Sequence, residues 1–317
     1  MKTSLISTLS LLLLSVISTS TLQAEIKEES VEYKAGEVVC EGWHAYDTSK
    51  TGKLPAVLII HQWTGLGENE KMRARMLAEL GYNVLAADIY GKGIRPQPPA
   101  AGAEAGKYKK DTALYRARLR AALEVLAKDG RTDSKRIGAI GYCFGGTGVL
   151  ELARSGAEVK GVVSFHGGLG TTAPEDAKNI KGEVLVCHGA DDPFVPPAEV
   201  ESFHMEMKAA GVKNEFIAYP GAVHAFTQKA AGNDNAKGVA YNASADAKSP
   251  RIEMVAYRSP TTALLAAAGA LRLARTPSLC KIPPGTSKFG RFSRRRTFQP
   301  WSRRACCSTP AVSSTRS

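Results

Sequence analysis

The sequence predicts an α/β fold in which helices cover both faces of a mostly parallel central sheet. Short apolar runs suited to buried strands alternate along the chain with longer segments of helical periodicity. This alternation is typical of a parallel sheet covered on both faces. The expected strands cover residues 31–46 (a leading pair), 56–60, 83–88, 136–140, 159–165, 183–187 and 215–219. The expected helices cover residues 68–80, 111–127, 147–154 and 197–210.

A long loop is expected at residues 92–107, which are rich in proline, glycine and alanine. Loops at the carboxyl ends of parallel strands line the ligand crevice of open α/β sheets. We therefore expect this loop to overhang the functional site.

Residues 1–24 have the composition of a secretory signal peptide. A basic start at Lys2 precedes an apolar stretch from Leu5 to Ile17 and a small-residue cleavage site that ends at Ala24. The apolar stretch is short and interrupted by serine, so we expect no stable membrane anchor after cleavage. The sequence thus predicts an exported protein, periplasmic in a Gram-negative source, whose folded domain covers residues 25–249.

The positive charge of the chain is confined to its last segment. The formal net charge is +12, but residues 1–250 contain 29 basic and 29 acidic residues. Residues 251–317 contain 13 basic residues and the single acid Glu253. Because the domain itself is balanced, we expect no nucleic-acid partner. Residues 250–317 are predicted to be either a basic, disordered tail or the product of a frameshift near residue 249.

The segment GYCFGG at residues 141–146 places a thiol between glycines, where an apolar strand gives way to a helix. This pattern is typical of a nucleophile elbow, a tight turn that forces one side chain out of the sheet and needs small residues on either side. The start of the helix favours the thiolate of Cys143. The backbone amide of Phe144 is directed to the place where an oxyanion would form.

The partners of such a nucleophile follow in a recognisable order. An acid loop, HGADDPFVP, comes after the strand at residues 183–187 and contains Asp191 and Asp192. A histidine loop, YPGAVHAF, comes after the strand at residues 215–219 and contains His224. The order nucleophile, acid, histidine is that of the α/β-hydrolases, so the sequence predicts an α/β-hydrolase fold.

With these motifs, residues 31–249 resemble the dienelactone hydrolase family, whose elbow carries cysteine in place of serine. The segments LIIHQWTG and AADIYGKG at residues 58–65 and 86–93 contribute to the resemblance. It implies that Cys143 is the nucleophile, that His224 is the general base and later the acid, and that Asp192, rather than Asp191, fixes the histidine tautomer. It also implies a second oxyanion donor, the backbone amide of Trp63.

The sequence departs from the family pattern at the substrate-binding positions. The glutamate that contacts the resting thiol in family members is replaced by Gln62, and the two arginines that hold the substrate carboxylate by Lys92 and Gln228. One positive charge remains, without the bidentate geometry of arginine. Tyr90 is expected to form a wall of the pocket.

These features predict carboxymethylenebutenolidase-like hydrolysis of a small ester or lactone through a thioester. This chemistry requires no metal or organic cofactor, and we expect a monomer.

Two alternatives remain open at this point. A glutamine amidotransferase-like or peptidase-like domain also carries cysteine on a strand-to-helix turn, although the separate acid loop argues against it. A binding protein on a degenerate hydrolase scaffold, with a basic tail, would not need Cys143.

Other cysteines and histidines are expected to be structural. Cys40 and Cys187 lie in strand-like stretches and are expected to be buried. His61, His166 and His188 lie at strand ends, where we expect packing and support of loops rather than catalysis.

Overall fold

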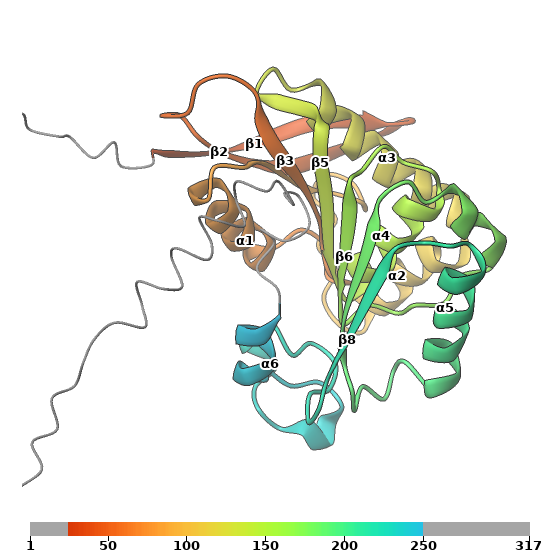
Figure 1. Ribbon diagram of the computed structural model, residues 1–317. Coiled ribbons are helices and arrows are strands. Elements are labelled where there is room, and N and C mark those ends of the chain that lie inside the picture. Colours follow the sequence, from red (N-terminus) through yellow and green to blue (C-terminus); the bar gives the residue numbers. More distant parts are fainter. Residues whose placement is uncertain (1–24, 250–317) are drawn as a thin grey trace, which may run out of the picture. The chain divides into compact units, whose positions relative to one another are not determined.

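The structure of the protein, a computed structural model, describes residues 25–249. The predicted signal peptide and the predicted basic tail lie outside these residues. Eight strands form one sheet in the order β1-β2-β4-β3-β5-β6-β7-β8 (Figure 1). The strands are β1 (Ile26–Ala35), β2 (Val38–Asp47), β3 (Leu54–Ile60), β4 (Asn83–Ala87), β5 (Thr132–Tyr142), β6 (Gly161–Phe165), β7 (Glu183–Gly189) and β8 (Asn214–Tyr219).

The sheet is antiparallel at one edge and parallel elsewhere. Strands β1 and β2 form the hairpin expected from the sequence, with Gly36 in the left-handed region at the turn (φ 64°). Strand β2 also pairs antiparallel with β4, whereas all pairs from β4 to β8 are parallel. Because the parallel strands end at the same edge of the sheet, the loops that follow them lie close together.

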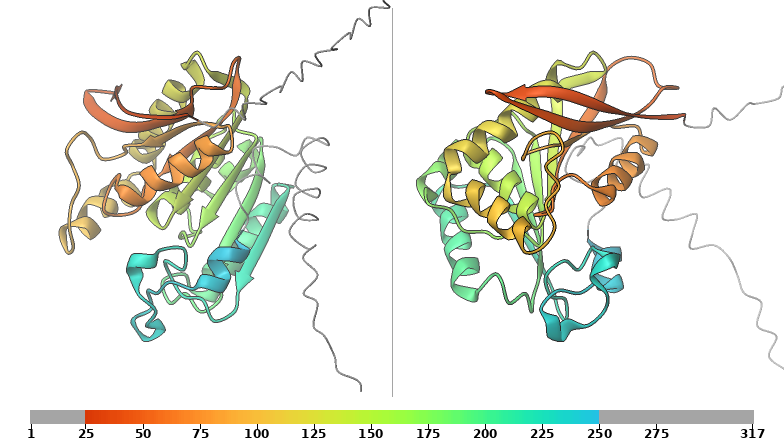
Figure 2. Two further views of the ribbon diagram at one scale, coloured as in Figure 1. Left: turned by 90° about the vertical axis from the view of Figure 1, so that its left-hand side faces the viewer. Right: turned by 180° about the vertical axis from the view of Figure 1, so that it is seen from behind.

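Helices cover both faces of the sheet (Figures 1 and 2). Helices α1 and α6 pack on one face, and α2 to α5 on the other. The helices are α1 (Glu68–Glu79), α2 (Ala100–Lys110), α3 (Thr112–Lys128), α4 (Phe144–Arg154), α5 (Pro197–Ala209) and α6 (Ala243–Lys248).

The apolar side chains of strand β3 pack into the core on both faces of the sheet. Its alternate side chains point to opposite faces. Leu58 and Ile60 are buried under α3 and α4, whereas Val57 and Ile59 are buried toward α1. A strand buried on both faces needs a continuous apolar run, which is the pattern that identified it in the sequence.

The predicted α/β architecture is confirmed, and one local expectation was wrong. Residues 100–110 form α2 instead of continuing the loop predicted over residues 92–107. The helix begins after Pro99 because the alanine-rich run favours helix despite its two glycines. Helix α4 begins at Phe144, directly after Cys143, which agrees with the helix start predicted at the elbow.

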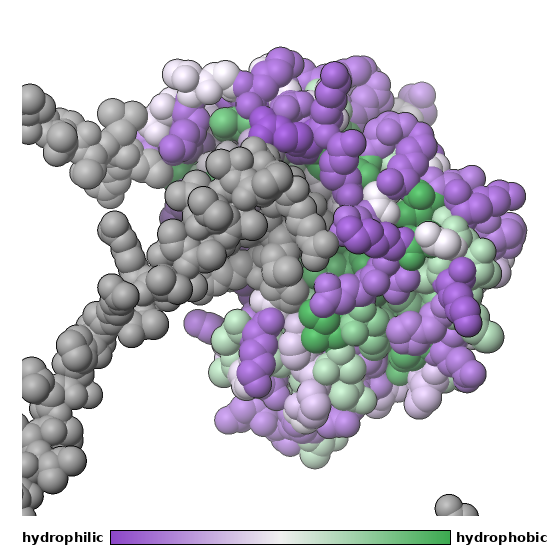
Figure 3. Space-filling model, in the orientation of Figure 1, coloured by the Kyte–Doolittle hydropathy of each residue, from purple (hydrophilic) through white to green (hydrophobic). Residues whose placement is uncertain are grey.

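The surface in Figure 3 is largely hydrophilic, with smaller hydrophobic areas near the strands at the β8 edge. Within residues 25–249, no helix is long and apolar enough to cross a membrane.

Close packing of α4 against the sheet depends on glycines that leave no room for a side chain. A Cβ atom on Gly141 would overlap the carbonyl oxygen of Gly145. A Cβ atom on Gly145 would overlap the carbonyl oxygen of Ile60 and lie 2.7 Å from that of His61. Since all of these obstacles are backbone atoms, they cannot move away without shifting β3 or α4.

We therefore expect Gly141→Ala to lower the free energy of unfolding by about 3 kcal/mol or more. Gly106→Ala is the matched control, because Gly106 lies in α2 and a Cβ there would meet nothing within 4 Å. That change should raise the free energy of unfolding by about 0.5 to 1 kcal/mol. Urea unfolding of the two variants measures both effects, and equal stability would contradict the packing argument.

Candidate active site

The turn between β5 and α4 holds Cys143 in a conformation that non-glycine residues rarely adopt, with φ 56° and ψ −114°. Its amide donates to the carbonyl of Phe165 (3.0 Å), and its own carbonyl accepts from the amides of Gly146 and Thr147. Such strain persists only where the surroundings fix the backbone, and it is common at functional sites. The elbow predicted from the sequence is therefore present.

Three side chains from separate loops meet at this turn. The Nε2 atom of His224 lies 3.0 Å from the Sγ atom of Cys143. On the other side of the ring, Nδ1 lies 2.8 Å from the Oδ2 atom of Asp192. The second oxygen of Asp192 accepts from the amide of Phe194 (2.9 Å), which holds the carboxylate in place. Asp191 is exposed and makes no such contact with His224. The acid that contacts His224 is therefore Asp192, the one that the sequence favoured.

The charges of this cluster favour a thiolate–imidazolium pair. Burial would lower the pKa of His224, but hydrogen bonds with Asp192 and Cys143 outweigh it and raise that pKa to about 9. Burial would likewise raise the pKa of the Cys143 thiol. The hydrogen bond to His224 and its charge, with smaller contributions from Lys109 and the amide of Phe144, lower it below its usual value. The two shifts agree in direction, since each partner stabilises the charged form of the other.

The loop between β3 and α1 lies against the elbow and contains Trp63. The carbonyl of Trp63 accepts from the hydroxyl of Tyr90 (2.9 Å), and the residue is 36% exposed. Tyr90 itself is buried and packs against Phe144, with ring centroids 5.4 Å apart. Tyr90 was predicted to form a wall of the pocket, but it does not line the cavity that adjoins the elbow; its hydroxyl instead holds the backbone of the loop.

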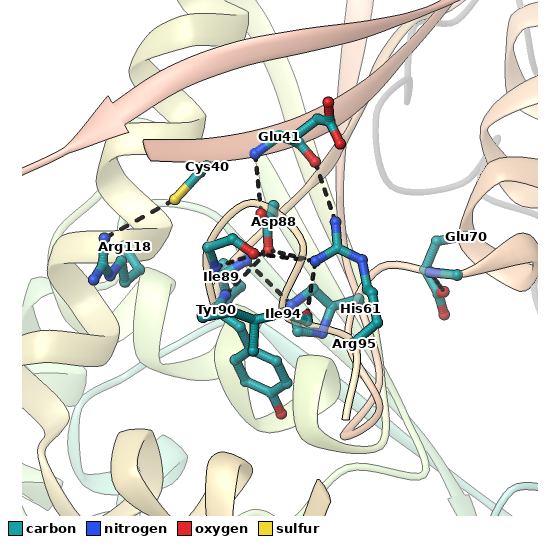
Figure 4. Close-up of polar contacts among 12 residues, drawn as sticks. Cys40, Glu41, His61, Glu70, Asp88, Ile89, Tyr90, Ile94, Arg95 and Arg118 are labelled. Carbon is teal, nitrogen blue, oxygen red and sulfur yellow. Dashed lines mark hydrogen bonds and ion pairs between the residues drawn. The ribbon is translucent and has the colours of Figure 1, made fainter. Parts of the chain in front are cut away.

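The amide of Gln62 is directed to a buried carboxyl group. Its Nε2 donates to Glu70 (3.1 Å), whose other oxygen accepts from the amide of Gly67 (3.0 Å). Burial raises the pKa of Glu70, and in the view of Figure 4 this residue lies on the other side of His61 from Cys40. Gln62 therefore links the loop to the start of α1 in this structure.

The two remaining positions expected to bind substrate differ in their surroundings. The ammonium of Lys92 pairs with Glu32 and Glu41 of the β1–β2 hairpin, so the structure does not bring it to Cys143. Gln228 follows the histidine loop, and its Nε2 is buried without an acceptor among the described residues.

An open cavity of about 340 Å³ adjoins the elbow, and sequence reasoning did not find its lining. The aromatic ring of Phe194, in this lining, stands edge-on to the ring of His224 at 5.4 Å between centroids. Further lining residues are Lys109, Thr112, Thr147, Thr172 and Glu199. An exposed lysine at the end of a helix carries no periodic signal, so nothing in the sequence singled out Lys109.

His166, His188, Cys40 and Cys187 have structural surroundings. His166 Nε2 lies 2.8 Å from the hydroxyl of Thr227, and burial holds its pKa well below the usual value. Burial also lowers the pKa of His188. Cys40 and Cys187 are fully buried, and burial raises the thiol pKa of Cys187 to about 12. Among residues 25–249, no group of three or more potential ligands is arranged to hold a metal ion.

The fold and this cluster are those of a hydrolase of the α/β-hydrolase class. A profile of the dienelactone hydrolase family matches residues 41–254, more than half of the 317 residues. The chain therefore belongs to the dienelactone hydrolase family.

Individual relatives agree with this assignment. A solved structure named m3DLH is 39% identical, covers 70% of this chain and 93% of its own, and superposes with a TM-score of 0.68. A dienelactone hydrolase-like promiscuous phosphotriesterase from metagenomic libraries is 35% identical over 78% of this chain and 98% of its own, also with a TM-score of 0.68. A proposed carboxymethylenebutenolidase from Methylorubrum extorquens is 30% identical over 187 residues, 55% of this chain and 64% of its own.

The thiolate–imidazolium pair predicts an unusual pH dependence of cysteine alkylation. Because its pKa is lowered, the Cys143 thiol loses its proton at a lower pH than an ordinary thiol does. His224 keeps its proton up to about pH 9. Iodoacetamide should therefore react with Cys143 faster at neutral pH than with an ordinary thiol, and the midpoint of the fall in rate at low pH should lie below the usual pKa of a thiol.

His224→Gln removes the charge, so that only the smaller contributions of Lys109 and the Phe144 amide oppose burial and the pKa of Cys143 rises. We expect alkylation at neutral pH to slow by about 10-fold or more, since each pKa unit changes the thiolate fraction up to tenfold. An unchanged rate profile in this variant would show that the histidine does not activate the thiol.

Proposed function

We propose that this hydrolase cleaves small carboxylic esters or lactones, with Cys143 as the nucleophile. The observation that carries the proposal is the continuous line of contacts from Sγ through His224 to Asp192, which lowers the pKa of the thiol and so favours the thiolate. A nucleophile, a base and a group that orients the base are the parts required for acyl transfer.

In the acylation step, the thiolate attacks the substrate carbonyl and forms a carbon–sulfur bond. The negative charge moves to the carbonyl oxygen, where the amides of Phe144 and Trp63 receive it. The tetrahedral intermediate then expels the alkoxide, which takes the proton held on Nε2 of His224. In a lactone the alkoxide stays attached to the acyl group.

In the deacylation step, the now neutral His224 takes a proton from water as the water attacks the thioester carbonyl. The carbon–sulfur bond breaks, the carboxylic acid leaves, and the thiolate–imidazolium pair is restored. Asp192 holds Nδ1–H throughout, so that Nε2 always faces the reacting atoms.

The cavity beside the elbow favours a substrate with polar groups. Its lining carries threonine hydroxyls and the ammonium of Lys109. The carboxylates in the same lining are already engaged: Glu199 accepts from the amides of Leu169 and Gly170, and Glu151 pairs with Arg154. Lys109 is therefore the group that we expect to attract an acidic substituent, in place of Lys92.

The test compares a carboxylated dienelactone, a neutral short-chain aryl ester and, because one neighbour is a promiscuous phosphotriesterase, a neutral phosphotriester. Cys143→Ala should reduce turnover at least about 10³-fold, with a smaller loss for Asp192→Asn. Cys187→Ala is the matched control, since that thiol is buried in β7. Turnover that survives Cys143→Ala would contradict the mechanism. Absence of turnover in the unmodified protein would favour the binding-protein alternative.

Lys109→Met should raise KM for the carboxylated substrate by about 3- to 10-fold, which corresponds to roughly 1 kcal/mol for an exposed ion pair. KM for the neutral ester should stay the same. Lys110→Met, one residue along α2 and outside the cavity lining, removes the same charge and serves as control. Equal effects of the two substitutions, or an equal effect on both substrates, would exclude a specific contact.

We further propose export of the protein, on the basis of residues 1–24 alone. Fractionation of the native host, followed by N-terminal sequencing of the mature chain, tests this. A mature chain that begins at Glu25 outside the cytoplasm is expected, and an uncleaved cytoplasmic chain would contradict export.

A further inference from the structure

We propose that His61 is a positioning residue that aims the amide of Trp63 into the oxyanion hole, by holding the carbonyl of the peptide that joins Gln62 to Trp63. The inference rests on the proposed function, because it assigns a role in the acylation step. His61 does not touch the substrate in this proposal; it acts through the backbone of the peptide between Gln62 and Trp63.

Both ring nitrogens of His61 are engaged with backbone groups. Nε2 lies 3.1 Å from the amide nitrogen of Ile89, and Nδ1 lies 2.6 Å from the carbonyl oxygen of Gln62. An amide can only donate, so Nε2 must be the unprotonated acceptor. The proton of the neutral ring is therefore on Nδ1, from where it donates to Gln62.

The bond to Gln62 sets the direction of the next amide. In a trans peptide the carbonyl and the N–H point in opposite directions. Holding the Gln62 carbonyl against His61 thus fixes the N–H of Trp63 on the far side of the peptide plane. Within residues 25–249, that N–H has no acceptor of its own, which leaves it available to an oxyanion.

The neighbouring contacts leave this peptide little freedom. The amide of Gly65 also donates to the Gln62 carbonyl (3.1 Å), and the hydroxyl of Tyr90 holds the carbonyl of the following peptide. At the elbow, the carbonyls of Ile60 and His61 lie so close to Gly145 that any Cβ there would collide with them. The loop is thus fixed against the turn that carries Cys143.

The position of His61 is in turn set by β4 and the turn that follows it. Asp88 is fully buried, and its Oδ1 accepts from the amides of Tyr90 and Gly91. This turn presents the Ile89 amide to the His61 ring, as Figure 4 shows. The ring packs between Tyr90 (4.6 Å) and Phe144 (5.7 Å), measured between centroids.

The ring keeps this hydrogen-bonding pattern across the working pH range. Burial lowers the pKa of His61 to about 4, so the imidazole stays neutral at neutral pH. A hydrogen bond to a peptide carbonyl also polarises the N–H of the same peptide and strengthens it as a donor. His61 therefore both aims and strengthens the amide of Trp63.

The experiment compares His61→Phe with His61→Asn. Phenylalanine keeps a ring between Tyr90 and Phe144 but donates nothing, whereas the Nδ2 of asparagine can replace the Nδ1–H donor. His44→Phe is the control for loss of a buried histidine, because His44 bonds to Asn83 in the β2–β4 part of the sheet. The readouts are kcat and KM for an ester, and the pH profile of Cys143 alkylation.

We expect His61→Phe to lower kcat by about 10- to 100-fold, somewhat less than removal of an oxyanion donor outright. KM and the alkylation profile should stay unchanged, because the pair of Cys143 and His224 is intact. His61→Asn should recover about 5-fold or more of the lost kcat, since it restores the donor. His44→Phe should leave kcat unchanged.

Three results would overturn the inference: an unchanged kcat in His61→Phe, equal losses in the phenylalanine and asparagine variants, or a fall in alkylation that matches the fall in kcat. The failure of the proposed function would look different. The unmodified protein would then hydrolyse no ester although Cys143 still reacts with iodoacetamide.

Discussion

The close approach of α4 to the ends of β3 and β5 is the constraint on which the site depends. Because Gly141 and Gly145 have no Cβ atom, the backbone at the start of α4 packs directly against the backbone at the ends of β3 and β5. This contact keeps Cys143 in its strained conformation. The same contact places the start of a helix under the thiol and the β3–α1 loop beside it. A single packing arrangement thus determines where the nucleophile, the helix N-terminus and the oxyanion loop lie.

Around this turn, charged and neutral histidines have separate tasks. His224 contacts a carboxylate and a thiol, so its pKa rises to about 9, whereas His61 is fully buried among backbone groups and its pKa falls to about 4. Environment alone makes one ring a proton carrier and the other a fixed hydrogen-bond donor. The family assignment identifies the protein as a hydrolase. The different roles of the two histidines explain how the described residues would carry out hydrolysis.

Local motifs predicted the fold and the cluster well, because the elbow, the acid loop and the histidine loop are contiguous segments. The loop expected over residues 92–107 was wrong for a local reason, because the alanine-rich run of α2 favours helix. The other features that were not foreseen depend on distant contacts. Lys92 was expected to meet substrate, but Glu32 and Glu41 of the leading hairpin engage it. Lys109 went unnoticed because an exposed lysine resembles any other until the cavity is seen. The tautomer of His61 depends on an amide 28 residues away and is invisible in the sequence.

The most direct test of the account is to identify the covalent intermediate. Mass spectrometry of protein quenched with acid during ester turnover should find the acyl group on the peptide that contains Cys143, as a thioester that is sensitive to hydroxylamine. Its rate of decay should equal or exceed the turnover rate. An acyl group on another residue, or steady turnover without any acylated Cys143 under conditions where deacylation is rate-limiting, would contradict the central claim.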